Sequence, residues 1–166
     1  LDYVQKNDLS CTVTVTDVKG LRTLPPHKQP NKDSYIHVDE IRDDGIVVSG
    51  YKCNQTGILF AHEIIIVPTT NMKPEEKDFA LACAIPSDTP GLTFVLGRTP
   101  QDKRFFEVGG DIEGIDLGKP YADHQALVYF DKVFVPNDRV FMCGETEYVG
   151  RLLSYFTAVH RLTAGG

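Results

Sequence analysis

A run of threonines that ends in a turn is the first segment with the chemistry of a binding site. Residues 14–20 read Thr-Val-Thr-Asp-Val-Lys-Gly, so hydroxyl groups alternate with other side chains and a glycine follows. Hydroxyls and free backbone N–H groups at a strand end can bind the carbonyls of a flat heterocycle, and Gly20 lets a ring or phosphate approach the backbone. The alternative is a solvated strand face, because threonine is a good strand former.

A second polar run has the same character. Residues 50–57 read Gly-Tyr-Lys-Cys-Asn-Gln-Thr-Gly and are followed by apolar residues. Amides and a hydroxyl at the end of a strand suit hydrogen bonding to a cofactor, whereas the simpler alternative is an ordinary turn. Either segment alone leaves both interpretations open.

The cysteines and histidines show no metal motif by their spacing. The four cysteines, Cys11, Cys53, Cys83 and Cys143, are 42, 30 and 60 residues apart, which fits neither a zinc nor a redox pattern. We expect them to be small buried hydrophobic residues in a reducing compartment. His160 stands at the end of a helical pattern, where the helix dipole favours a charged histidine, so a structural role is one explanation. The histidines at 27, 37, 62 and 124 are expected on the surface or in loops.

The elements that must position these residues are mostly strands. Apolar residues alternate with hydroxyls from Leu9 to Thr16, which predicts a half-buried strand with its hydroxyls on the outer face. Further strands are predicted at 35–42, 46–52, 63–67, 79–85 and 92–96, and 126–130 with 133–135 are predicted as a last pair after a long glycine-rich connection. From Glu145 onward apolar residues recur every three or four positions, which predicts a helix. The pattern therefore indicates a β-barrel or sandwich followed by one helix.

Composition restricts the class of protein. The chain has 166 residues, 42% hydrophobic and 24% charged, which is typical of one globular domain. A net charge of −6 without a basic cluster argues against nucleic-acid binding. No apolar run approaches the roughly 20 residues of a membrane helix. The chain starts without Met or a signal peptide, and we expect it to be part of a larger cytoplasmic enzyme.

Several segments, in order, resemble the middle domain of the 4-hydroxyphenylacetate 3-hydroxylase family, and most closely its 4-hydroxybutyryl-CoA dehydratase branch. They are residues 16–20, 44–52 and 54–57, the stretch 127–141, which is similar to the family's VFDxVFVPxxRVF motif, and His160-Arg161 with Gly165-Gly166. The resemblance implies a mainly β, acyl-CoA dehydrogenase-like architecture. Residues 1–142 would be the flavin-binding middle β-barrel domain, and residues 143–166 the start of a C-terminal helical domain.

The resemblance also implies roles for individual residues. The FAD would be contacted by Thr14, Thr16, Asp17, Lys19 and Gly20, while Gln55 and Thr56 would lie near its isoalloxazine ring. Thr56 would be catalytic, close to the reactive nitrogen. His160 would be catalytic as a ligand of a 4Fe–4S cluster, whose other ligands, all cysteines, would lie outside this chain.

Two positions depart from the dehydratase pattern. Ala164 stands where a tyrosine is expected four residues after His160, and Gln125 stands where a glutamate is expected before the 126–130 strand. A glutamate can act as a base and a glutamine cannot, so altered chemistry is an open alternative.

Three functions follow from this reading of the sequence. The first is conversion of 4-hydroxybutyryl-CoA to crotonyl-CoA with vinylacetyl-CoA isomerase activity, in a homo-oligomer expected to be a tetramer. The second is a two-component flavin monooxygenase that hydroxylates a phenol such as 4-hydroxyphenylacetate. The third is a non-catalytic β-barrel module. We expect no nucleic-acid or membrane partner, and we expect the isolated chain to be inactive.

Overall fold

The computed structural model describes residues 2–97 and 125–164, with side chains described as far as Val159. The elements in these ranges are α1 (Asp2–Lys6), β1 (Cys11–Thr14), β2 (His37–Ile41), β3 (Gly45–Thr56), β4 (Glu63–Ile66), β5 (Leu81–Pro86), β6 (Leu92–Leu96), β7 (Gln125–Pro136), β8 (Val140–Cys143) and α4 (Thr146–Ala164). A mainly β chain that ends in a helix is therefore confirmed. The predicted glycine-rich connection lies outside the described residues. No helix in the described ranges is long and apolar enough to cross a membrane.

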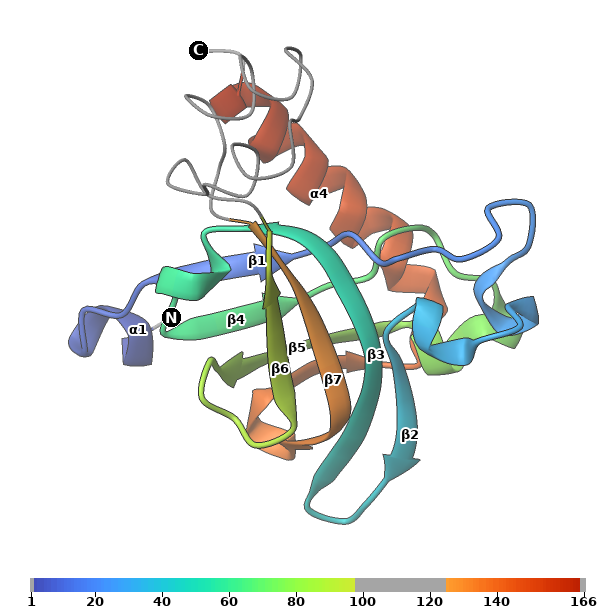
Figure 1. The fold of residues 1–166 in the computed structure, drawn as a ribbon, viewed down its shortest axis with the longest axis horizontal. Coiled ribbons are helices and arrows are strands. Elements are labelled where there is room, and N and C mark those ends of the chain that lie inside the picture. The colour runs from blue at the N-terminus through green and yellow to red at the C-terminus, as the bar shows by residue number, and fades with distance from the viewer. Residues whose placement is uncertain (1, 98–124, 165–166) are drawn as a thin grey trace, which may run out of the picture.

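The strands form two four-stranded sheets, with the orders β1-β4-β5-β8 and β2-β3-β7-β6. Only β1 and β4 pair in parallel among the described strands. Figure 1 shows the strands of one sheet running across those of the other. Apolar residues from both inner faces form one core, which includes Val48, Ile64, Phe130 and Val135. This burial explains the period-two pattern of β-branched residues in the sequence.

The sequence predicts a β-barrel or sandwich, and the described residues show two sheets without a closed barrel. Within the described residues, the two sheets are joined at β1 and β3 by the isolated bridge between Asp17 and Lys52 and not by a continuous ladder. β3 is itself irregular here, because its register against β7 shifts between Lys52 and Gln55. The domain boundary predicted at 142/143 falls within β8 and stays a prediction.

The predicted pair 126–130 and 133–135 is in fact one strand, β7. Asp131 and Lys132 look like a turn in the sequence, but both are exposed and the strand continues through them. Lys132 has a φ of 50° and its N–H donates to Ser49 Oγ at 3.3 Å. The partner strand β3 shifts its register at the same place, so the pair accommodates an irregularity and resumes.

The orientation predicted for the first strand is wrong. Thr14 is fully buried, whereas Cys11 and Val13 are exposed. The hydroxyls point inward because acceptors are available there. Thr12 Oγ1 donates to Thr56 O and Thr14 Oγ1 donates to Ile65 O, both at 3.2 Å. A buried hydroxyl that is hydrogen-bonded carries little penalty.

The four cysteines are free thiols with different surroundings. The expectation of buried thiols is confirmed for Cys83, where burial raises the pKa to about 12, and is wrong for Cys11, which is exposed. We therefore predict that Cys11 is alkylated first in the native protein and that Cys83 is protected. Mass spectrometry of peptides after iodoacetamide treatment measures both, and labelling in urea provides the control in which all four react. Native labelling of Cys83 as fast as Cys11 would contradict the prediction.

Candidate functional site

The two polar segments predicted separately lie side by side. After β1, the chain runs antiparallel to the second half of β3, with Asp17 bridged to Lys52. Cys53 N–H donates to Thr16 O at 2.8 Å, and Gln55 Nε2 donates to the same oxygen at 3.2 Å. Figure 1 shows β1 passing close to the end of β3. The fold therefore combines residues 14–20 and 50–57 into one surface.

A buried ion pair lies beneath this junction. Lys52 Nζ is 2.9 Å from Asp17 Oδ1, and the two side chains are 0% and 1% exposed. Nζ also donates to Val15 O at 2.7 Å and to Val67 O at 2.9 Å, so all three ammonium protons have acceptors. Asp17 Oδ1 accepts a further bond from Ile36 N–H at 3.1 Å.

Burial and charge act in opposite directions on this pair. Burial raises the pKa of Asp17, and the nearby Lys52 charge opposes that rise. Burial likewise lowers the pKa of Lys52, and Asp17 opposes that fall. Since every ammonium proton has an acceptor, the geometry is that of a charged pair.

Lys52 is the residue that the sequence reading missed. It occupies the same inward phase of β3 as Ile46 and Val48, because side chains two residues apart share a face. A lysine at an inward position of a strand needs a buried partner. That signal was present in the sequence, but it does not identify Asp17 as the partner.

The groups that remain available for a ligand are fewer than predicted. Within the described part of the chain, the hydroxyls of Thr16 and Thr56 make no hydrogen bond, and Thr56 is exposed. Thr14, Asp17 and Gln55 are buried, and Thr14 Oγ1, Asp17 Oδ1 and Gln55 Nε2 bond to the protein itself.

The backbone around these hydroxyls is unusual. Two of the four non-glycine residues with positive φ in the described ranges lie here, Lys19 at 69° and Asn54 at 54°. Such conformations cost energy and persist only where the surrounding structure enforces them. They are therefore often found at ligand sites. Gly57 has a φ of 71° with no atom within 4 Å of the place where a Cβ would be. By contrast, a Cβ at Gly20 would meet Gln29 Oε1 at 2.5 Å, so Gly20 is closely packed.

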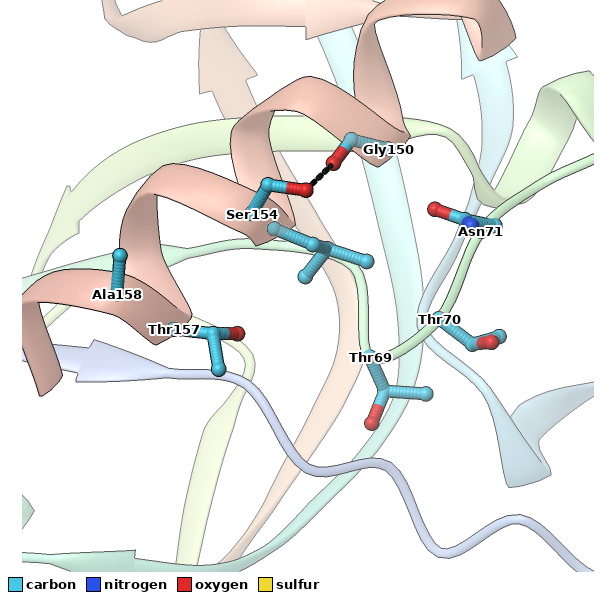
Figure 2. Close-up of a pocket in the computed structure, with 8 residues that line it drawn as sticks. Thr69, Thr70, Asn71, Gly150, Ser154, Thr157 and Ala158 are labelled. Carbon is cyan, nitrogen blue, oxygen red and sulfur yellow. Dashed lines mark hydrogen bonds between the residues drawn. The ribbon is translucent and has the colours of Figure 1, made fainter. Parts of the chain in front are cut away.

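A polar cleft of about 530 Å³ lies between α4 and the loop after β4. Figure 2 shows its lining, which the sequence reading did not single out: Thr69, Thr70, Asn71, Gly150, Leu153, Ser154, Thr157 and Ala158. Ser154 Oγ donates to Gly150 O at 2.8 Å. A Cβ at Gly150 would lie 3.1 Å from Asn71 Oδ1, so glycine allows α4 to approach the loop. Among the described residues, none that lines the cleft is charged.

The metal prediction rests on a residue whose side chain is not described. The backbone of His160 lies in α4, but its side chain and that of Ala164 are beyond the described ones. Among the described residues, no three His, Cys, Asp or Glu side chains are grouped to hold a metal ion. The cluster ligand therefore stays a prediction.

The other notable positions are placed more clearly. Gln125, one of the two departures from the dehydratase pattern, pairs directly with Thr56 across β3 and β7. His37 is 1% exposed, contrary to the surface position expected for it. Its ring is buried because both nitrogens have partners, Tyr35 O at 3.0 Å and Asp39 Oδ1 at 3.1 Å. His27 and His62 are exposed, as expected, while His124 lies outside the described residues.

Comparison with known proteins identifies the family of this chain. A family described as the 4-hydroxyphenylacetate 3-hydroxylase N terminal matches residues 1–142. The 4-hydroxybutyryl-CoA dehydratase/vinylacetyl-CoA-Δ-isomerase of Clostridium aminobutyricum is 45% identical over 167 residues, which cover 100% of this chain and 34% of that protein. The chain thus spans about a third of the length of this relative.

Solved structures of similar proteins share this fold. An oxygen-tolerant archaeal 4-hydroxybutyryl-CoA dehydratase from N. maritimus superposes with a TM-score of 0.82 at 36% identity, over 96% of this chain and 31% of that one. The oxygenase component of 4-hydroxyphenylacetate 3-monooxygenase, complexed with FAD, has a TM-score of 0.71 at 33% identity, over 89% of this chain and 29% of that one. Glutaryl-coenzyme A dehydrogenase, with a TM-score of 0.52 at 15% identity over 86% of this chain and 29% of that one, shares the fold alone. The predicted likeness to acyl-CoA dehydrogenases is thereby confirmed.

Proposed function

Because this chain belongs to the 4-hydroxyphenylacetate 3-hydroxylase family, we propose that it forms the FAD-binding β region of a flavin-dependent enzyme. The observation that carries the proposal is the junction of residues 14–20 with 50–57, which presents the unbonded hydroxyls of Thr16 and Thr56. The relative of known structure that contains FAD shares this fold. The residues present fit a flat, hydrogen-bonding cofactor.

The residues divide into two groups in this proposal. Thr16, Lys19, Gly20 and Thr56 contact FAD, with Thr56 close to the reactive nitrogen. Thr14, Asp17 and Gln55 support that surface from beneath, because their polar atoms are bonded within the chain. Bound FAD would supply reversible one-electron chemistry, which makes the β-hydrogen of an acyl-CoA acidic without net redox change.

The reaction we propose is conversion of 4-hydroxybutyryl-CoA to crotonyl-CoA, with isomerisation of vinylacetyl-CoA at the same site. Its support is the 45% identity with the Clostridium enzyme along the whole chain and the TM-score of 0.82 with the archaeal one. His160 would then be a ligand of a 4Fe–4S cluster, with cysteines supplied by sequence outside this chain. We place this enzyme in the cytoplasm as a homotetramer.

The test uses the protein expressed from its complete gene and purified without oxygen. We expect a flavin spectrum, about four irons per chain, and activity on 4-hydroxybutyryl-CoA. His160→Ala should lose the iron and the activity while it keeps FAD. His62→Ala is the matched control, because His62 is an exposed histidine whose ring contacts Ser10, and it should keep both.

The other outcomes of that experiment are equally informative. Flavin without iron would return His160 to a structural role. Absence of both chromophores would overturn the FAD proposal and leave the fold as the only conclusion.

A second candidate is the flavin monooxygenase activity of the FAD-containing relative. The observation that favours it is Gln125, which faces Thr56 in the sheet and cannot serve as a base. Hydroxylation of 4-hydroxyphenylacetate by the purified protein with reduced FAD and oxygen, together with no activity on 4-hydroxybutyryl-CoA, would decide for this candidate.

A further inference from the structure

We infer that the buried Lys52–Asp17 pair is a positioning device for the FAD-binding surface. It holds the segment after β1 against β3 and so sets where Thr16 and Thr56 present their hydroxyls. The inference rests on the proposed function. Neither residue of the pair is expected to touch FAD, because both side chains are buried.

The first argument is connectivity. One ammonium group bonds to two different segments: the segment after β1, through Val15 O and the carboxylate of Asp17, and the segment after β4, through Val67 O. Asp17 adds a third segment through Ile36 N–H, just before β2. Moving Lys52 Nζ therefore moves the backbone on both sides of Thr16.

The second argument is that no continuous strand ladder fixes this junction in the described residues. Besides the pair, the segment before the turn is tied to β3 by Cys53 N–H and Gln55 Nε2, which both donate to Thr16 O, and by Cys53 Sγ to Asp17 O at 3.4 Å. Thr12 Oγ1 adds a bond from β1 to Thr56 O. The bonds to Thr16 and Asp17 come from residues within three positions of Lys52 along β3.

The third argument concerns the use of charge in the core. A buried ion pair is weak evidence for stability, because apolar residues of similar volume often stabilise as well or better. Apolar residues here would also leave the carbonyls of Val15 and Val67 without this donor. What the pair provides that an apolar contact does not is a fixed direction and distance between two segments.

An ion pair away from this junction makes the inference testable. In this partly buried pair, Arg139 Nη1 is 2.8 Å from Glu63 Oε2. Their side chains are 25% and 6% exposed. Neither residue bonds to the segments at 14–20 or 50–57 in the described part of the chain. This pair is a matched control for the loss of a charged contact elsewhere in the same sheets.

The experiment compares Asp17→Asn/Lys52→Met with Glu63→Gln/Arg139→Met in the protein expressed from its complete gene. The FAD dissociation constant, the flavin midpoint potential and the urea unfolding midpoint are measured for each. We expect the first variant to raise the dissociation constant at least about tenfold and to shift the potential, because small misplacements of binding groups have large effects. The control should stay within about twofold in affinity even where its unfolding midpoint falls as far.

Asp17→Glu is the milder variant, which keeps both charges and lengthens one arm. It should also shift the potential, because the added methylene pushes the segment that carries Thr16. If the double variant fails to fold, Asp17→Glu decides the question. Wild-type FAD affinity and potential in whichever variant is folded would overturn the inference, as would an equal loss of affinity in the control. A wild-type protein that binds no FAD would instead overturn the proposed function, and the inference with it.

Discussion

Lys52→Met alone is expected to lower the free energy of unfolding by about 3–5 kcal/mol, because it leaves a buried carboxylate without its counter-charge. Asp17 would keep the Ile36 N–H as a donor but lose the ammonium at 2.9 Å. The carbonyls of Val15 and Val67 would lose the same donor. Urea unfolding followed by circular dichroism measures the change.

The double variant Asp17→Leu/Lys52→Met is the control for this prediction. Removing both charges removes the uncompensated one, so at least about half of the lost free energy should return. A single variant as stable as the double variant would show that the unpaired charge of Asp17 is not the cause of the loss.

The pH dependence of the single variant provides an independent check. Burial already raises the pKa of Asp17 above its ordinary 3.8, and loss of Lys52 removes the charge that opposes this rise. A carboxyl whose pKa is raised in the folded state binds its proton more tightly there, so its penalty is full above the folded pKa and fades as the pH falls. Lys52→Met should therefore be less destabilised, relative to the wild type, at about pH 5 than at about pH 8.

Gly50→Ala is the second substitution with a large expected effect. Gly50 lies where β2 approaches β3, with a φ of 124°, which side chains rarely tolerate. A Cβ there would lie 2.6 Å from Tyr35 O and 2.8 Å from Ile36 Cα. Both are backbone atoms, so no rotamer change relieves the overlap. We expect a loss of about 3 kcal/mol or more in the free energy of unfolding.

Gly57→Ala separates the steric cause from the conformational one. Gly57 also has a positive φ, 71°, but no atom lies within 4 Å of its would-be Cβ. It should lose only the roughly 1–2 kcal/mol of a left-handed residue. Equal losses in the two variants, measured by urea unfolding, would show that the dihedral angle and not the contact with Tyr35 decides the effect at Gly50.

The fold class was predictable because the spacing of the apolar residues differs between strands and helices. Val133 and Val135 in β7 alternate with the exposed Phe134, and the apolar residues from Tyr148 onward recur at helical spacing, so each element is visible without its neighbours. The order of motifs along the chain identified the family in the same way. What periodicity could not reveal is which face of an amphipathic strand turns inward when both faces can be satisfied. Thr14 is buried because Ile65 O happens to accept its hydroxyl.

By itself, the sequence determined that the chain is mainly β with a C-terminal helix, that it belongs to a flavin enzyme family, and that residues 14–20 and 50–57 are its polar strand ends. Only the tertiary structure decided that these segments meet, since their contact depends on partners such as Val15 and Lys52, which are 37 positions apart. It also decided which polar groups are left for a ligand, because Asp17 Oδ1 and Gln55 Nε2 bond inside the chain. The physical reason is that periodicity describes the environment of one residue, whereas a hydrogen bond or ion pair needs two residues brought together by strand register.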